Sequence, residues 1–303
     1  MYFCGAEQAV GMSWKQGAKR MKLCVTSNII SGCANGKNDQ FAETLSFLKA
    51  AGFEEIDFPF STPMMLQEDW KEDFRIKRTM AEEAGVRIRY AHLPFDYPAE
   101  GRGYGWEEFR TASCRAIELA CGAGVDCAAI HPRTWMTRDY DAAREYENAV
   151  EFLSFYCGYA KQEGLTLAIE NMRGPGRSAP KEIMRFGTET DDLIRMADEL
   201  GTGICWDTGH GHISGQPQRE SLMKIGGLLK MVHINDNFAE DDVHIAPFIG
   251  SVQWDEAAAG LKAVGFAGSL NLEVGCRKLP EELRAGYAAY MASAARKIAE
   301  MIG

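Results

Sequence analysis

The sequence lacks the patterns that mark membrane, secreted or disulfide-stabilised proteins. No apolar run approaches the roughly 18 residues that a membrane-spanning helix needs, and residues 1–20 contain no continuous apolar segment of about 7 residues like that of a secretory signal. The nine cysteines are irregularly spaced without a Cys-x-x-Cys pair, which is typical of reduced, buried thiols rather than of disulfides or a zinc knuckle. We therefore expect a cytoplasmic protein without membrane association.

Two further features that the sequence lacks, an excess of basic residues and a phosphate-binding loop, argue against one class of partner and one class of fold. The chain has 33 Lys and Arg residues against 43 Asp and Glu residues, and its net charge of -10 disfavours general attraction to nucleic acid. No Gly-x-Gly-x-x-Gly phosphate loop follows the first expected strand, which argues against an open, doubly wound sheet.

Short apolar runs alternate with segments of helical periodicity along the chain. The strands are expected at residues 22–27, 54–58, 87–92, 127–131, 165–170, 203–207, 229–234 and 269–273. The helices between and after them are expected at residues 39–51, 68–84, 106–121, 141–163, 190–200, 220–227, 254–264 and 280–301. With 303 residues and 46% hydrophobic composition, the pattern predicts one α/β domain, a (β/α)8 TIM barrel over residues 21–303 preceded by an N-terminal extension at residues 1–20.

Six of the expected strands end in a side chain that can bind a metal. These residues are His92, His131, Glu170, Asp207, His233 and Glu273. Successive members lie 26 to 40 residues apart, which fits one strand, one helix and two connections for each step. Because the carboxyl ends of barrel strands converge on one mouth, we expect a metal centre there.

Four of these residues suit a single divalent cation. Glu170, Asp207, His233 and Glu273 combine three carboxylates with one imidazole, a set that favours Mn, Mg or Co over a thiolate-binding metal. An unpaired carboxylate at Glu170 would be costly to bury, so a metal or cation partner is required. We expect Glu170 and Glu273 to face each other across the barrel axis, where they could move a proton between two faces of one carbon.

Further candidates lie in the connections. His210 follows Asp207 by three residues, and Asp242 and His244 lie in the long loop after residue 234, where ligand and solvent-exposed roles are both open. Three arginines follow strand ends by two to four residues and favour an anionic or phosphorylated substrate, unless they are solvated surface side chains. They are Arg133, Arg173 and Arg277.

Five motifs, in this order, resemble those of the xylose isomerase-like TIM barrels over roughly residues 22–300. They are Ala168-Ile169-Glu170-Asn171, Asp207-Thr208-Gly209-His210, Val232-His233-Ile234-Asn235-Asp236, Asp242-x-His244 and Leu272-Glu273. That superfamily contains sugar isomerases and epimerases, hydroxypyruvate isomerase, inosose dehydratase and the apurinic endonuclease of the endonuclease IV type. In its sugar branch, the resemblance implies that Glu170, Asp207, His233 and Glu273 bind one Mn, Mg, Co or Zn ion. It also implies that Glu170 and Glu273 transfer protons and that His210 contacts a substrate oxygen.

The resemblance is incomplete in one part of the sugar branch. Ketohexose 3-epimerases carry a glutamate six residues after the first metal glutamate and an arginine six residues after the metal histidine. Gly176 and Ala239 occupy those positions here. The departure argues against that particular activity.

In the endonuclease branch, nine residues hold three zinc ions, and all nine types are present here. The matching positions are His92, His131, Glu170, Asp207, His210, His233, Asp242, His244 and Glu273. However, Arg133 replaces a glycine after His131-Pro132, and no basic, aromatic loop suited to entering DNA is evident.

The hypothesis that follows is a metal-dependent isomerase or epimerase of a small sugar or sugar derivative, acting by proton transfer through an enediolate. His92, His131, His210, Arg133, Arg173 and Arg277 are its expected substrate-binding residues. An inosose-type dehydratase, a trizinc phosphodiesterase acting on abasic DNA and a non-catalytic ligand-binding barrel remain alternatives. The expected partner is a small molecule rather than nucleic acid, and a homo-oligomer is left open.

Overall fold

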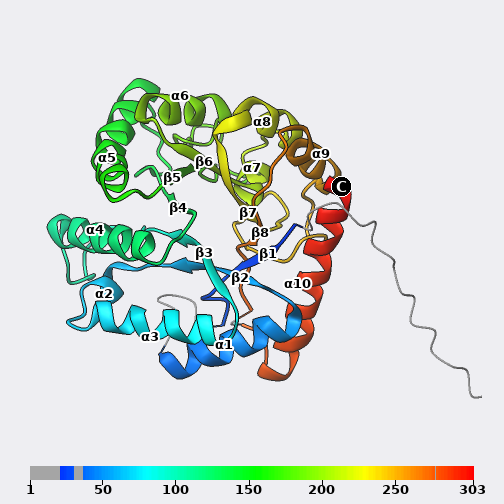
Figure 1. The fold of residues 1–303 in the computed structure, drawn as a ribbon. Helices are drawn as coiled ribbons and strands as arrows, with labels where there is room; N and C mark the ends of the chain where they lie inside the picture. The colour runs from blue at the N-terminus through cyan, green and yellow to red at the C-terminus, as the bar shows by residue number, and fades with distance from the viewer. Residues whose placement is uncertain (1–20, 31–36, 277) are drawn as a thin grey trace, which may run out of the picture.

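The computed structural model describes residues 21–30, 37–276 and 278–303. The expected extension at residues 1–20 and Arg277 lie outside the described residues. Eight parallel strands pair in chain order and close into a barrel, with β1 against β8, and the helices surround it (Figure 1). The strands are β1 Leu23–Thr26, β2 Glu55–Pro59, β3 Arg87–His92, β4 Cys127–Ile130, β5 Leu167–Glu170, β6 Gly203–Asp207, β7 Leu229–Ile234 and β8 Leu270–Leu272. The predicted (β/α)8 barrel is confirmed.

The helices agree closely with the periodicity of the sequence, and two short ones were not expected. Their bounds are α1 Asn38–Ala51, α2 Thr62–Met65, α3 Trp70–Glu83, α4 Trp106–Gly122, α5 Ala142–Glu163, α6 Thr190–Leu200, α7 Thr208–Ile213, α8 Gln218–Ile225, the 3-10 turn η2 Gly226–Leu228, α9 Trp254–Ala263 and α10 Glu281–Ile302. Left-handed residues such as Gly164, with φ 85°, end the longer helices where the sequence places a glycine. The unexpected helices α2 and α7 each have six or fewer residues, too few for a periodic apolar pattern to be visible.

Alternation along the strands sorts the core into two parts. Residues such as Ile169, Trp206 and Val232 face outward and pack against the helices in the large hydrophobic core. The alternate residues fill the barrel with a second cluster of small or flexible side chains: Cys24, Tyr90, Cys127, Ala129, Ala168, Cys205 and Met231. Their thiols are unpaired and buried, as expected. The same period of two directs Glu170, Asp207 and His233, at or next to the ends of β5, β6 and β7, into the barrel mouth.

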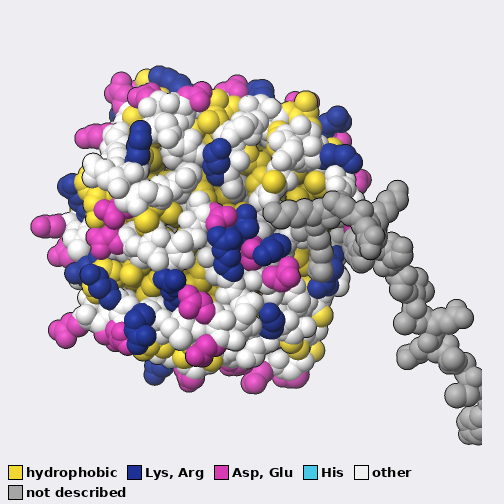
Figure 2. Space-filling model, in the orientation of Figure 1, with side chains coloured by type: hydrophobic (Ala, Val, Ile, Leu, Met, Phe, Trp, Pro, Cys, Tyr) yellow, Lys and Arg dark blue, Asp and Glu magenta, His cyan; other side chains and the backbone are white. Residues whose placement is uncertain are grey.

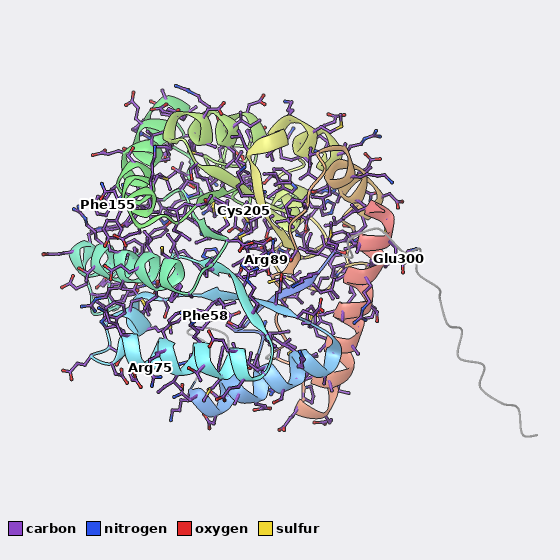
Figure 3. The ribbon with its side chains drawn as sticks, in the orientation of Figure 1. Phe58, Arg75, Arg89, Phe155, Cys205 and Glu300 are labelled. Atoms are coloured by element: carbon purple, nitrogen blue, oxygen red, sulfur yellow. The ribbon has the colours of Figure 1, made fainter. Side chains whose placement is uncertain are left out.

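The opposite end of the barrel, where the strands begin, is closed by ion pairs. The carboxylate of Glu55 is fully buried and lies 3.2 Å from Lys22 Nζ and 3.4 Å from Arg89 Nη1. Ser269 Oγ donates a hydrogen bond to the same carboxylate, and Arg89 Nη2 lies 3.0 Å from Asp126. Arg89 lies near the centre of the ring of helices (Figure 3), and basic and acidic side chains intermix at the centre of the face in Figure 2.

Among the described residues, no helix is both long and apolar enough to cross a membrane.

The ion pairs around Glu55 lead to a prediction about the stability of the fold. Glu55→Gln should lower the free energy of unfolding by about 3 kcal/mol, because it leaves Arg89 without its buried counter-charge. Urea unfolding of the chelator-treated protein would measure the effect. Glu54→Gln, at an exposed position one residue earlier, is the control and should change little; an equal loss in both variants would contradict the assignment.

Candidate metal centre

Nine ligand-type side chains gather at the mouth in overlapping groups, within each of which the ligand atoms lie within 4.8 Å of one another, and three of these groups together contain all nine. The four-residue group is Glu170, Asp207, His233 and Glu273; the β3–β4 group is His92, His131 and Glu170; the loop group is His210, Asp242 and His244. Every residue that the sequence singled out as a metal ligand is therefore in one of these groups. Glu170 belongs to two of them.

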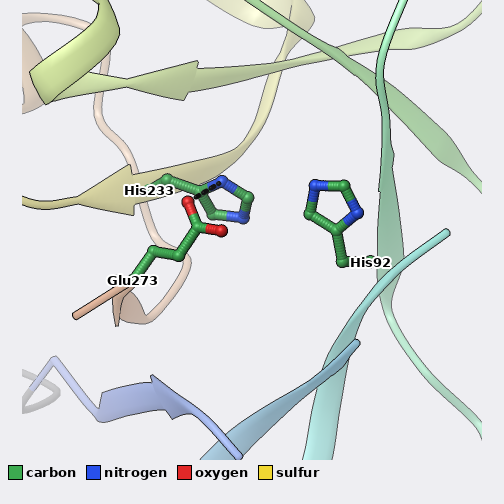
Figure 4. A group of neighbouring side chains, drawn as sticks. All are labelled: His92, His233 and Glu273. Atoms are coloured by element: carbon green, nitrogen blue, oxygen red, sulfur yellow. Dashed lines mark ion pairs between the residues drawn. The ribbon is translucent and has the colours of Figure 1, made fainter. Parts of the chain in front are cut away.

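In the four-residue group, an imidazole lies between two carboxylates. His233 Nδ1 is 3.1 Å from Glu170 Oε1 and 3.1 Å from Glu273 Oε2, and Figure 4 shows His233 beside Glu273 with His92 across from both. These three atoms are buried and have no hydrogen-bond partner among the described residues. Buried polar atoms left unpaired are costly. Their convergence therefore fits a divalent cation bound by oxygen and nitrogen.

The orientation of His233 is set from the other side of the barrel. Its Nε2 lies 3.5 Å from Oδ2 of Asp57, a buried residue of β2. The same Asp57 oxygen accepts a hydrogen bond of 2.9 Å from Asn271 Nδ2. A carboxylate facing Nε2 favours the tautomer that carries its proton there, which leaves the Nδ1 lone pair for a metal.

The β3–β4 group has the spacing of a tetrahedral site. His92 Nδ1 lies 2.8 Å from the carbonyl oxygen of Leu93, and because a carbonyl only accepts, Nδ1 carries the proton. His92 Nε2, His131 Nε2 and Glu170 Oε2 are then 3.2 Å apart in all three pairs. Ligands bonded at 2.0 Å to a tetrahedral ion lie about 3.3 Å apart. The group therefore fits a second ion as well as it fits a bound substrate oxygen.

In the loop group, each histidine again has a backbone carbonyl at Nδ1 and a carboxylate at Nε2. His210 Nδ1 lies 2.8 Å from the carbonyl oxygen of Asn171, and His244 Nδ1 lies 2.8 Å from that of Glu273. Their Nε2 atoms lie 3.2 and 3.1 Å from the two oxygens of Asp242. His244 adopts φ 45°, a conformation uncommon for a residue other than glycine, which its loop holds in place.

Asp207 is held by amide side chains whose role was not anticipated from the sequence. Asn171 Oδ1 accepts from Asp207 N at 2.6 Å, and Asn235 Nδ2 donates to Asp207 Oδ2 at 2.7 Å. Asp207 also caps α7, because its Oδ1 accepts from His210 N at 2.6 Å. A Cβ on Gly209 would lie 1.8 Å from Asn235 Oδ1, so this position requires glycine. The motif Asp207-Thr208-Gly209-His210 thus fixes a carboxylate and an imidazole together.

The charges in the mouth are strongly coupled. Burial alone would raise the pKa of Glu170, but the imidazoles of His233 and His131 hold it well below its usual range. Burial raises the pKa of Asp207 to about 6. Burial opposes the protonation of His210, but the carboxylates of Asp207 and Asp242 raise its pKa to about 9. An ion that binds here must displace imidazole protons, so its affinity rises with pH through the range where they titrate.

The structure places the three candidate arginines differently. Arg173 borders the loop group, with Nε 3.7 Å from Asp242 Oδ2. Arg133 instead packs its guanidinium 5.0 Å from the Trp106 ring and 5.7 Å from the Trp135 ring, and it forms no ion pair with any ligand-type residue among those described. Arg277 lies outside the described residues.

Comparisons with known proteins agree with this geometry. The family described as xylose isomerase-like TIM barrel matches residues 45–294. The uncharacterized protein y4fM of Sinorhizobium fredii is 34% identical over 76% of this chain and 79% of its own length. The uncharacterized protein MJ1311 of Methanocaldococcus jannaschii is 28% identical, and the match spans about half of each chain, 52% of this one and 54% of the relative.

Solved structures share the fold at low sequence identity. A xylose isomerase domain protein from Alicyclobacillus acidocaldarius superposes with a TM-score of 0.71 and 17% identity, over 93% of this chain and 99% of the other. A D-allulose 3-epimerase from Methylomonas sp., solved in complex with D-allulose, superposes with a TM-score of 0.66 and 16% identity, over 92% and 96%. With its closed eight-stranded barrel and the extent of the family match, this chain belongs to the xylose isomerase-like TIM barrel family.

Proposed function

We propose that this chain is a metal-dependent isomerase or epimerase of a small sugar or sugar derivative. The observation that carries the proposal is the four-residue group, in which oxygens of Glu170 and Glu273 each lie 3.1 Å from His233 Nδ1 at the barrel mouth. The epimerase among the structures of similar fold supports this class of reaction by analogy.

Glu170, Asp207, His233 and Glu273 would hold the ion, which could be Mn, Mg, Co or Zn. When bound, such an ion acts as a Lewis acid that polarises a carbonyl oxygen. One glutamate removes a proton from the carbon beside the substrate carbonyl, which leaves an enediolate, and the other glutamate returns a proton.

Glu170 and Glu273 differ in how far their side chains are exposed to a substrate in the mouth. The side chain of Glu170 is 1% exposed, and both of its oxygens face imidazoles. The side chain of Glu273 is 23% exposed. We therefore assign the larger proton-transfer role to Glu273, with Glu170 mainly holding the ion and orienting the histidines.

The loops over the mouth argue for a substrate other than a free ketohexose epimerised at its third carbon. The ketohexose 3-epimerases carry a glutamate at the position of Gly176, where a Cβ would lie 2.2 Å from the carbonyl oxygen of Glu240. Arg177 N donates to the carbonyl oxygen of Ala239 at 3.1 Å, so the two loops contact each other through their backbones. No side chain fits at residue 176 without separating them. A dehydratase that expels hydroxide from the same intermediate remains compatible with this site.

A second function is favoured by a specific observation, the completeness of the β3–β4 and loop groups. Three neighbouring metal positions would suit phosphodiester hydrolysis, in which several ions stabilise the attacking and leaving oxygens. The net charge of -10 disfavours a nucleic acid substrate. The number of bound ions separates the two functions.

The first prediction concerns that number. Protein purified without chelator should contain about one tightly bound divalent ion per chain, and Asp207→Asn should lose it because a charged carboxylate ligand is replaced by a neutral, weaker one. Elemental analysis measures the content. His212→Gln is the control, since His212 contacts Ser251 outside the three groups. About three zinc ions per chain, together with cleavage of a duplex containing an abasic site, would replace the isomerase proposal with the hydrolase.

The second prediction concerns proton transfer. Glu273→Gln should lower kcat by about 10²–10⁴-fold with a much smaller change in KM, because an amide cannot accept the proton. Activity must be compared at equal metal content, with the exposed Glu182→Gln as the control. Solvent deuterium should enter wild-type product at the carbon beside the carbonyl. Turnover without deuterium uptake would indicate a hydride shift and remove Glu273 from the proton path.

The third prediction concerns Asp57. Asp57→Asn should weaken metal binding by about 10–100-fold, because His233 loses the charged partner that selects its tautomer. Metal titration by calorimetry measures the affinity, and nitrogen-15 NMR of the imidazoles reports which nitrogen of His233 carries the proton. Asp198→Asn, at an exposed position of α6, is the control. An unchanged tautomer and an unchanged affinity would show that Asp57 is a packing residue only.

A further inference from the structure

The loop between β5 and α6, residues 171–189, contains Arg173, Arg177 and Arg185, and the last of these was not singled out from the sequence. Arg185 Nη1 lies 3.5 Å from the carbonyl oxygen of Arg173, and Arg185 Nε lies 3.3 Å from Thr134 Oγ1. The Thr134 hydroxyl is buried and donates its own hydrogen to the carbonyl oxygen of Phe186 at 3.0 Å. It therefore offers Arg185 a lone pair and fixes the direction of the guanidinium.

Arg185 has neutral partners only. Among the residues that the structure describes, no carboxylate lies within ion-pair distance, 4.0 Å, of its guanidinium. Burial, together with the positive charge of Arg173, lowers the pKa of Arg185 to about 10. The carboxylates of Asp242 and Glu170 act in the opposite direction on this pKa, although neither forms an ion pair with Arg185. A half-buried guanidinium without a directly paired carboxylate is unfavourable, and an anion that contacts both Arg185 and Arg173 would stabilise the two positive charges.

The pair borders the candidate metal centre. Arg173 Nε lies 3.7 Å from Asp242 Oδ2, and that oxygen is 3.2 Å from His210 Nε2 in the loop group. The side chain of Arg173 is 36% exposed, so it can reach a bound molecule. An anionic group held by both guanidiniums would thus lie at the rim, with the rest of a small molecule extending toward the ligand groups.

We propose that Arg173 and Arg185 form a subsite for an oxyanion of the substrate, a phosphate monoester or a carboxylate, so that the chain acts on anionic rather than neutral sugars. This rests on the proposed function for the identity of the remaining substrate. The planar fork of a guanidinium suits both oxyanions, which bind it in pairs of parallel hydrogen bonds. Arg133, enclosed by aromatic rings, is not part of the subsite.

The test separates the subsite from the reaction. Binding of inorganic phosphate, a sugar phosphate, a sugar acid and the corresponding neutral sugar is measured by calorimetry in the chelator-treated protein, where no ion can hold the anion. Arg185→Met and Arg173→Met should each weaken anion binding by about 10–100-fold, since a hydrogen-bonded charge pair contributes roughly 1.5–3 kcal/mol. Arg185→Lys should weaken it less, because it keeps the charge but loses the fork. Arg138→Met, at an exposed position of the β4–α5 loop, is the matched control and should bind as the wild type does.

In the metal-loaded protein, Arg185→Met should raise KM for the anionic sugar by a larger factor than KM for the neutral sugar, whereas Arg138→Met should change neither. Preference for the phosphate or for the acid identifies the oxyanion, and either supports the subsite. Anion binding that depends on the arginines without any sugar turnover would retain the subsite and reject the isomerase. The subsite proposal would be wrong if the wild type and both methionine variants bound anions with equal affinity and had equal melting temperatures. If the protein still turned over a sugar, the isomerase proposal would remain.

Discussion

Compensation of buried negative charge is the constraint on which the mouth of this barrel depends. Glu170 and Asp207 are buried at the ends of β5 and β6, and each must be balanced in a region from which water is largely excluded. The histidines provide part of the balance, and backbone carbonyls fix three of them so that one ring nitrogen always faces a carboxylate. The carboxylate oxygens of Glu170 and Glu273 that remain without a hydrogen bond converge where a cation could bind. Helix α7 follows from the same constraint, because the carboxylate that needs balancing also caps it.

The barrel and its ligand-type residues could be predicted from the sequence because both follow from short-range periodicities. Alternation of two along β5, with Ala168 and Glu170 inside and Ile169 outside, determines which side chains enter the mouth. The order of strands then follows from the right-handed crossover rule. Glu273 was predicted in this way from the residue pattern alone, and the structure places it beside His233.

The remaining parts of the site depend on where long connections lie in space. Asp57 lies within the strand expected at residues 54–58, but its contact with His233 joins β2 to β7 and has no sequence signal. The positions of Arg133 and Arg185 also depend on these connections, and the role of Arg133 in substrate binding stays a prediction. A short distance from a strand end suggested Arg133, whose side chain packs among aromatic rings. Arg185 is 15 residues from Glu170 in the sequence, yet the loop folds back so that its guanidinium reaches the carbonyl of Arg173.

Glu170 directs one oxygen to the four-residue group and the other to the β3–β4 group. A ligand shared in this way makes occupancy of the two positions thermodynamically linked, since whatever occupies one changes the electron density available to the other, and the linkage is reciprocal. Loss of this single side chain would therefore remove a ligand from both positions. A descendant that abandoned the β3–β4 position by changing His92 or His131, in contrast, would retain a complete four-residue group. The β3–β4 group thus depends on a residue of the four-residue group, whereas the four-residue group is complete without His92 and His131.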